Sequence, residues 1–361
     1  MGASPSDGFR ATKEYDDDMA DMGNLGALSR YADVTRELGS SFVASVLEAG
    51  ERQLYHAPHT AALIAAWDGN SATAALAMRF NGALHALARQ GHIDRLSALY
   101  RLEHDDFDGA IGGALAAEDD FVAKWMRDPP QTNEVGRAAS ILSALMVVRQ
   151  ETGLPVELLE IGSSGGLNLN LARYAYDLGG VAAGMPGSPV HIAPKWTGSP
   201  PPLETVEVVS ARGVDLRPLD PSDDTMRDRL LSFVWADQRD RARRLQRALE
   251  VARMYPPRVE QGDAVVWLKQ QLDLPQRAGL SRVVFHSMVL QYLTEPGRNA
   301  VIDMIAEAGS RATVERPLAW VSFEWTPTRS EVQLRLTCWP TGETRHLATC
   351  HPYGDWVAWR G

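Results

Sequence analysis

The chain has 361 residues, of which 45% are hydrophobic and 23% are charged. This balance is ordinary for a globular protein and excludes a wholly disordered or fibrous chain. Acidic residues (46) outnumber basic ones (36), and the formal net charge of −10 offers no broad positive field for nucleic acid. No stretch approaches the roughly 18 uninterrupted apolar residues of a membrane span. We therefore expect a small-molecule partner and neither nucleic acid nor a membrane.

The length and the cysteine content indicate the number of domains and the redox setting of the chain. A single domain usually has roughly 100–200 residues, so two domains are expected. The two cysteines, Cys338 and Cys350, lie too close to the end to stabilise a fold of this size, and the start shows no apolar signal core. This favours a reducing, cytoplasmic setting. We predict a disordered tail over 1–22, a helical cap domain over 23–150 and an α/β domain over 151–361.

Helical periodicity dominates the first half. Apolar residues recur at four-residue spacing along two predicted helix faces: Leu38, Phe42 and Val46, and Leu76, Phe80 and Leu84. Pro129 and Pro130 stop this pattern, and Thr132 is then a good N-cap for a further helix. The first half is therefore expected to be all helical.

After Pro155 the pattern changes to short apolar strands separated by amphipathic stretches. The candidate strands are 156–161, 206–211, 283–286 and 318–323. Alternation of this kind predicts a parallel sheet with helices on both faces. Two further runs, 332–339 and 344–350, are joined by Pro-Thr-Gly-Glu and indicate a C-terminal hairpin. The predicted fold is α/β and Rossmann-like, and its layout resembles that of class I methyltransferases.

The strongest local signal is the segment 158–168, Leu-Leu-Glu-Ile-Gly-Ser-Ser-Gly-Gly-Leu-Asn. A buried strand ends in an acidic residue, a turn of small residues follows, and a helix is expected to begin. Glycine permits a ligand to approach the backbone closely, and the amides of a helix start favour an anionic group.

This segment resembles the acidic-x-Gly-x-Gly-x-Gly pattern of methyltransferases that bind S-adenosylmethionine (SAM), with Ser164 in place of the middle glycine. The resemblance implies that the helix amides hold the carboxylate of SAM and that an acidic side chain attracts its ammonium group. The expected cofactor-binding residues are Glu160, Gly162, Ser163, Ser164, Gly166 and Asn168. The spacing does not fit the Gly-x-Gly-x-x-Gly of dinucleotide-binding proteins. The alternative is a tight turn without a ligand.

Two further acidic residues follow strand candidates. Asp215 resembles the carboxylate that this fold places on the ribose hydroxyls, because a carboxylate accepts from two adjacent hydroxyls. Its alternative is a turn that continues to Pro218. Asp263, followed by Ala264, stands where methyltransferases often accept from the adenine amino group.

Candidate catalytic residues stand at the end of the fourth strand and ahead of the first. His286 and Ser287 end a strand where ligands of α/β sheets bind, and His286 is a candidate base near neutral pH. Its alternative is a polar residue that holds the loop. Arg137, with Thr132 and Asn133, could close over the ligand and offer a planar fork to a carboxylate. Helix capping and an interdomain salt bridge are the alternative.

Two polar residues in the helical half complete the candidate set. Arg79 and His85 lie along an apolar helix and are candidates for substrate binding, although such a histidine is more often a core residue. No metal site is expected, since Cys350 and His351 are adjacent whereas zinc ligands are usually spaced.

Four segments resemble the bacterial DUF2332 family, an uncharacterised group with a methyltransferase-like domain. They are 131–137 (Gln-Thr-Asn-Glu-Val-Gly-Arg), 235–238 (Trp-Ala-Asp-Gln), 283–287 (Val-Val-Phe-His-Ser) and 351–357 (His-Pro-Tyr-Gly-Asp-Trp-Val). The resemblance implies the fold and carries no activity with it. The leading hypothesis is a SAM-dependent methyltransferase whose small-molecule acceptor lies between the cap and the sheet. The rivals are a non-catalytic SAM-binding sensor and a nicotinamide-dependent Rossmann enzyme.

Overall fold

The computed structural model describes residues 26–67 and 75–361, so the tail predicted for 1–22 lies outside the described residues. The chain divides into two compact units. The first runs up to Thr132 and also contains Asp224–Arg243, and the second contains Asn133–Asp223 and Arg244–Gly361. The first boundary thus lies earlier than the expected one at 150. None of the described helices is long and apolar enough to cross a membrane.

The first unit is built of helices in its described part. They are α2 (Ala27–Glu37), α3 (Ser41–Gln53), α4 (Pro58–Ala65), α5 (Leu76–Gln90), α6 (Asp94–Tyr100), α7 (Phe107–Arg127), α9 (Asp224–Ser232) and the start of α10 (Arg239–Met254), with the 3-10 turn η1 (Leu54–His56). The helical prediction for this region is confirmed. The apolar face predicted in α5, which includes Phe80, is fully buried.

One predicted helix face was wrong. Leu38 does not share a helix with Phe42, because Gly39 adopts a φ of +90° and breaks the chain between α2 and α3. Ser40 is the N-cap of α3, and its Oγ accepts a hydrogen bond from the Val43 amide at 3.0 Å.

Residues 224–243 join the helical unit through specific contacts. Phe233 packs on Trp125, with ring centroids 6.2 Å apart. The Ser40 hydroxyl lies 2.8 Å from a carboxylate oxygen of Asp237. A segment inserted between two strands of the second unit is therefore part of the core of the first.

The second unit is built on a nine-stranded sheet in the order β5-β12-β11-β10-β9-β8-β1-β6-β7. The strands are β1 (Val156–Ile161), β5 (Lys195–Thr197), β6 (Val208–Asp215), β7 (Val259–Gln261), β8 (Ser281–Ser287), β9 (Leu318–Trp325), β10 (Val332–Trp339), β11 (Glu343–Cys350) and β12 (Trp356–Trp359). Strands β7, β6, β1, β8 and β9 are parallel neighbours, and β10 and β11 form the predicted hairpin. The prediction of an α/β protein with a mostly parallel sheet is confirmed.

The strand order reverses beside β1. The chain leaves β1 to form β6 and β7 on one side, and then returns to form β8 and β9 on the other. Loops that leave parallel strands in opposite directions open a crevice at their carboxyl ends, and ligands of α/β sheets bind there.

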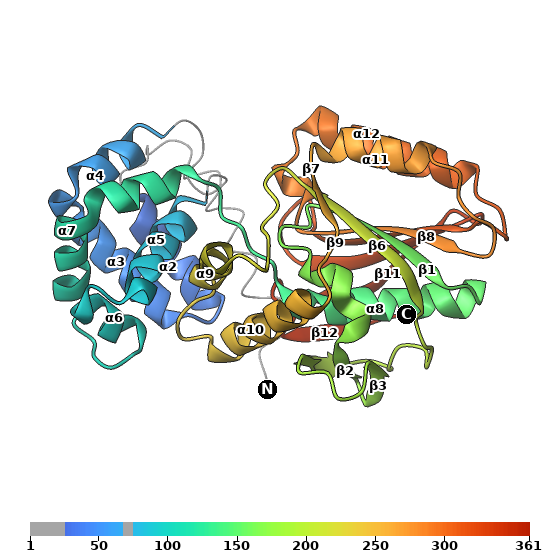
Figure 1. The fold of residues 1–361 in the computed structure, drawn as a ribbon, viewed down its shortest axis with the longest axis horizontal. Helices are drawn as coiled ribbons and strands as arrows, with labels where there is room; N and C mark the ends of the chain where they lie inside the picture. Colours follow the sequence, from blue (N-terminus) through green and yellow to red (C-terminus); the bar gives the residue numbers. More distant parts are fainter. Residues whose placement is uncertain (1–25, 68–74) are drawn as a thin grey trace. The chain divides into compact units, whose positions relative to one another are not determined.

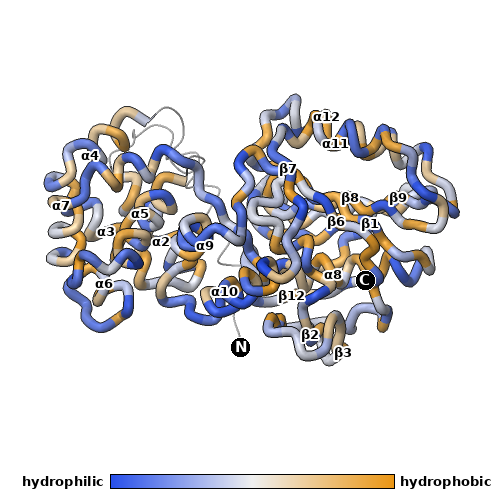
Figure 2. Tube along the Cα trace, viewed as in Figure 1, coloured by the Kyte–Doolittle hydropathy of each residue, from blue (hydrophilic) through white to orange (hydrophobic). Residues whose placement is uncertain are grey.

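Helices cover both faces of this sheet. Helices α11 (Ala264–Asp273) and α12 (Glu295–Ser310) lie together on one face, and α8 (Ala138–Thr152) lies on the other (Figure 1). Leu159, Val284 and Ile305 belong to the buried cluster between the sheet and the α11–α12 pair. Figure 2 shows the central strands and α8 as largely hydrophobic, whereas α10 is largely hydrophilic. The contacts of α8 with β9, β10 and β11 explain why it belongs to this unit.

Shorter elements fill the connections. The segment after β1 contains the 3-10 helix η3 (Leu167–Arg173) and a small sheet of β2 (Ala175–Leu178), β3 (Val181–Gly184) and β4 (His191–Ile192). Two further 3-10 turns, η2 (Val135–Arg137) and η4 (Leu290–Tyr292), precede α8 and α12.

Candidate functional site

Glu160 lies at the carboxyl end of β1, between its neighbours Gly213 of β6 and Phe285 of β8. The residue is only 2% exposed, and its Oε2 atom has no hydrogen-bond partner. Burial raises the pKa of this carboxyl well above 4.5, and the charge of Asp215 raises it further. A hydrogen bond from Ser163 and the charge of Arg137 oppose these effects. An acceptor in such a position gains most from a ligand that donates a hydrogen bond or carries a positive charge.

The loop after β1 needs its glycines for the protein's own packing. Gly162 has a φ of +70°, and a Cβ atom there would lie 2.4 Å from Val289 Cγ2. A Cβ atom on Gly166, whose φ is +69°, would lie 2.6 Å from Val259 Cγ2. Larger side chains at these two positions would disturb the fold itself, so they cannot serve as probes of ligand binding alone.

Ser164 takes the position of the middle glycine and keeps the backbone conformation that glycine favours, with a φ of +52°. Its amide donates to Asp215 Oδ2 at 2.8 Å, and Asp215 Oδ1 accepts from the Arg217 amide at 2.9 Å. The carboxylate at the end of β6 therefore holds the loop that follows β1. Each of its oxygens keeps capacity for a further hydrogen bond.

A helix follows this loop as expected, and it is a 3-10 helix. The segment is the seven-residue 3-10 helix η3, in which Asn168 and Asn170 alternate with leucines. Asparagine side chains compete with helical hydrogen bonds, which accounts for the short element. The Leu167 amide already donates to Asn133 Oδ1 at 2.9 Å, and the Gly166 amide to Ser163 O at 2.7 Å. These amides are engaged within the protein, unlike those of an open helix start.

Two more buried oxygens, in the segment that follows Glu160, lack partners. Ser164 Oγ and Asn168 Oδ1 have no hydrogen-bond partner, and the two residues are 6% and 1% exposed. Buried polar groups in native proteins are nearly always paired. The three oxygens of Glu160, Ser164 and Asn168 can therefore each accept a hydrogen bond from a further donor.

Arg137 connects three segments at the same end of the sheet. Its Nε donates to Pro352 O at 2.9 Å, and its Nη1 donates to Ser287 O at 3.2 Å. Nη1 also lies 3.4 Å from Ser287 Oγ, and the guanidinium lies over the Phe323 ring. Burial lowers the pKa of Arg137, and the charge of Glu134 opposes this shift. Ser287, expected to contact a cofactor, is thus a partner of Arg137.

The predicted start of the helix after Pro130 was also wrong. Helix α8 begins at Ala138, preceded by η2, and Glu134 rather than Thr132 caps this turn by accepting from the Gly136 amide at 2.9 Å. Thr132 is exposed and belongs to the helical unit.

The loop 351–355 packs so closely against η2 that only glycine fits at the two contact positions. A Cβ atom on Gly136 would lie 2.4 Å from Tyr353 O, and one on Gly354 would lie 2.4 Å from the Gly136 carbonyl carbon. Arg244 Nη2 lies 3.3 Å from Glu134 Oε1 in the same region. Glu134 lies in the polar run ahead of the first strand that the sequence indicated, whereas the sequence reasoning missed Arg244 as a member of this cluster. Segments 131–137 and 351–357, which meet here, both belong to the family resemblance.

His286 is fully buried at the end of β8, and both of its ring nitrogens are engaged. Nδ1 lies 2.6 Å from Glu324 Oε1, and Nε2 accepts from Trp320 Nε1 at 2.9 Å. Glu324 Oε1 also accepts from the Val289 amide at 2.9 Å. Both engaged nitrogens favour the alternative of a polar residue that holds the turn after β8, and a catalytic role for His286 stays a prediction.

We expect His286→Phe to lower the free energy of unfolding by about 2–4 kcal/mol, because the partly buried Trp320 and Glu324 side chains would lose a partner. Urea unfolding followed by circular dichroism measures this loss. His346, which is only partly buried, provides the matched control, and His346→Phe should cost less than about 1 kcal/mol. A stable His286→Phe protein that lost activity alone would instead assign the histidine to proton transfer.

Asp263 caps α11, since its Oδ1 accepts from the Val265 amide at 2.9 Å and from the Val266 amide at 3.0 Å. The residue is exposed and follows β7, with Ala264 as the first residue of the helix. Its capping role accounts for the motif without a ligand, while Oδ2 stays available. Contact of Asp263 and Ala264 with a cofactor stays a prediction.

Arg79 and His85 both lie in α5 of the helical unit. Arg79 Nη1 donates to Met126 O at 3.0 Å near the end of α7, and His85 Nδ1 lies 3.1 Å from Ser232 O. Burial lowers the pKa of His85 to about 4, with a smaller effect from the charge of Arg89. Both side chains thus contribute to the core of this unit. A substrate-binding role for them and for Thr132 stays a prediction.

The family model described as an uncharacterized protein conserved in bacteria (DUF2332) matches residues 26–359. The chain therefore belongs to the DUF2332 family, as predicted from its motifs. No curated protein and no solved structure matches the chain.

Proposed function

We propose that this chain binds SAM at the carboxyl ends of β1 and β6 and transfers its methyl group to a small-molecule acceptor. The observation that carries the proposal is the set of unpartnered buried oxygens of Glu160, Ser164 and Asn168. These atoms can accept hydrogen bonds from the ammonium group of a ligand, and a buried carboxylate in addition favours its charge. Bound SAM would supply an electrophilic methyl group on a sulfonium.

Residues at the ends of neighbouring strands can bind the ribose and the adenine of this ligand. Strands β7, β6, β1, β8 and β9 stand in the doubly wound order, in which a nucleotide binds where the order reverses. Asp215 lies at the end of the strand next to β1, where its free lone pairs can accept from ribose hydroxyls. Asp263 follows the next strand, β7, and suits the adenine amino group.

A cation suits the carboxylate of the ligand, because the amides of Ser164, Gly166 and Leu167 are engaged within the protein. Arg137 is buried and close enough to Glu160 for its charge to affect that carboxyl. Its Nε and Nη1 are used, whereas its Nη2 donates no hydrogen bond within residues 26–67 and 75–361. A guanidinium edge beside a buried carboxylate suits the zwitterionic end of an amino acid.

Isothermal titration calorimetry of the full chain tests the binding step. S-adenosylhomocysteine should bind at least tenfold more tightly than methylthioadenosine, which lacks the amino-acid end that Glu160 and Arg137 would recognise. NADH and NADPH should show no saturable binding. Tighter binding of NADH, or equal affinities for the two thioethers, would contradict the proposed site.

Transfer is tested separately with SAM that carries a tritiated methyl group and a fraction of bacterial small molecules. Label should pass to an acceptor in the presence of the protein. Tight binding of S-adenosylhomocysteine without transfer would favour a sensor over an enzyme.

A further inference from the structure

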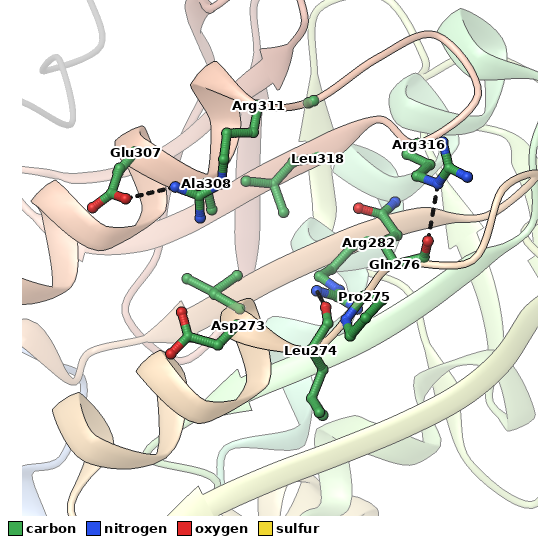
Figure 3. Close-up of a pocket in the computed structure, with 12 residues that line it drawn as sticks. Asp273, Leu274, Pro275, Gln276, Arg282, Glu307, Ala308, Arg311, Arg316 and Leu318 are labelled. Carbon is green, nitrogen blue, oxygen red and sulfur yellow. Dashed lines mark hydrogen bonds and ion pairs between the residues drawn. The ribbon is translucent and has the colours of Figure 1, made fainter.

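A second candidate site lies at the opposite end of the sheet. A cavity of about 440 Å³ opens between the carboxyl ends of α11 and α12, and we name it the Arg282 cavity. The lining residues that matter for its chemistry are Leu272, Arg282, Ala308, Arg311, Arg316 and Leu318. Figure 3 shows Leu318 between the α12 residues Ala308 and Arg311 and the β8 residue Arg282.

The strand register separates this cavity from the SAM site proposed above. Arg282 is the second residue of β8 and pairs with Leu318, the first residue of β9. Glu160 lies at the other end of β1, opposite Phe285. Because β1, β8 and β9 are parallel, the cavity lies at the amino ends of the strands and Glu160 at the carboxyl ends.

Arg282 is a buried cation within the wall of this cavity, with a side chain that is only 8% exposed. Its Nε donates to Glu157 Oε1 at 2.5 Å, and its Nη1 donates to Gln271 O at 3.2 Å and to Leu274 O at 3.1 Å. These bonds fix the plane of the guanidinium. Its Nη2 donates no hydrogen bond within the described residues and is the nitrogen left for a ligand.

The charges around the cavity leave one cation in excess. Glu307 pairs with Arg311 at 2.6 Å, as Figure 3 shows, and Lys269 pairs with Asp273 at 2.6 Å. Arg316 donates its Nε to Gln276 O at 3.1 Å and has no ion pair within the described residues. With Arg282 neutralised by Glu157, a single positive charge remains, which matches a monoanion.

The rest of the wall is apolar. Leu272 and Leu318 are 9% and 3% exposed, and Ala308 packs partly buried against the same core cluster. Small-molecule sites combine such apolar walls with a few fixed polar groups, and this volume falls in their usual range. A ligand that fills the cavity therefore needs an apolar body as well as a negative charge.

We propose that the Arg282 cavity binds a small monoanion with an apolar tail, of the class of a short- or medium-chain carboxylate. The carboxylate lies against Nη2 of Arg282 and the terminal nitrogens of Arg316, and the tail lies against Leu272, Ala308 and Leu318. This site is independent of the SAM site and does not rest on it.

Calorimetry of the full chain with hexanoate, acetate and hexan-1-ol separates charge from tail. Each buried CH₂ group should strengthen binding about fourfold, so hexanoate should bind at least tenfold more tightly than acetate. Hexan-1-ol has the tail without the charge and should bind more weakly than hexanoate. Equal affinity for acetate and hexanoate would show an adventitious anion on surface charge and would overturn the proposal.

Two variants locate the binding, with one matched control. Arg316→Gln should weaken hexanoate about tenfold without changing the weak binding of hexan-1-ol. Ala308→Leu fills the cavity and should weaken both ligands. Arg298→Gln, an exposed position near the start of α12, should change neither. Unchanged hexanoate binding in Ala308→Leu or Arg316→Gln would remove the site, and so would competition between hexanoate and S-adenosylhomocysteine.

Discussion

Glu160→Gln is expected to weaken S-adenosylhomocysteine binding about 100-fold and to stabilise the ligand-free protein above neutral pH. Removal of one partner from a buried pair of charges costs roughly 2–5 kcal/mol, which gives the loss of affinity. The gain in stability arises in the ligand-free protein, where no ligand ammonium group offsets the burial of the Glu160 carboxylate. The Glu160 carboxyl is buried and its pKa is raised, so the ligand-free protein must ionise it at a cost that glutamine avoids.

The pH dependence follows from that shift. Above the pKa of the unfolded state, about 4.3, the folded protein binds more protons at Glu160 than the unfolded chain does. Wild-type stability therefore falls as the pH rises through the pKa of the folded state. The difference in unfolding free energy between Glu160→Gln and wild type should grow from pH 5 to pH 8. Glu207→Gln, at an exposed position ahead of β6, should show no such trend.

Binding of the ligand should show the reverse linkage. An ammonium group beside Glu160 favours the ionised carboxyl, so a proton leaves on binding and wild-type affinity for S-adenosylhomocysteine should rise with pH. Methylthioadenosine affinity should be insensitive to both pH and Glu160→Gln. If glutamine weakened the two thioethers equally, Glu160 would shape the loop and would not contact the amino-acid end.

The strands that the sequence predicted are those with a strong local signal. β1 and β10 were predicted with their observed bounds, because each is an apolar run bounded by turn residues. β7 and β5 have three residues each and carry no periodicity to detect. Strand order was beyond the sequence, since it depends on pairings between distant segments.

The sequence also did not show to which of the two units each helix belongs. The hydrophobic residues of α8 predict that the helix is buried, but they do not show which unit it packs against. The predicted domain boundary was therefore placed after this helix. Residues 224–243 follow β6 in the chain and yet pack in the helical unit through Phe233. An amphipathic helix is compatible with either core, and the choice is made by tertiary contacts.

The sequence predicted which residue types stand at the candidate site, but not the contacts that they make with one another. The acidic end of β1 and its small-residue turn were visible in the sequence, and Glu160 and Ser164 lie where expected. The sequence did not show that Asp215 holds the Ser164 amide or that Glu324 and Trp320 engage both nitrogens of His286. Side chains that satisfy a loop and side chains that bind a ligand are the same residue types, so only geometry separates them.

Arg137→Met is expected to lower the free energy of unfolding by about 3–5 kcal/mol, the largest loss of stability that we expect from one substitution in the second unit. Methionine would leave the carbonyls of Pro352 and Ser287 without their donor and would remove one of the two cations near the buried Glu134, which keeps Arg244. Because these carbonyls belong to segments far apart in the chain, the loop 351–355 should detach from η2 first. Limited proteolysis should therefore cleave this loop sooner than in wild type.

Two further variants separate the packing role of Arg137 from its proposed contact with the ligand. Arg149→Met removes an arginine from the exposed end of α8, where Nη1 donates to Gly153 O at 2.7 Å, and should cost less than about 1 kcal/mol. Arg137→Lys keeps the charge but cannot donate to Pro352 and Ser287 at once, so stability should return only in part. Measured with this folded variant, S-adenosylhomocysteine should bind about tenfold more weakly while methylthioadenosine is unchanged. If both ligands kept their wild-type affinities, Arg137 would hold the strand ends together without meeting the ligand, and the carboxylate would have to be bound elsewhere.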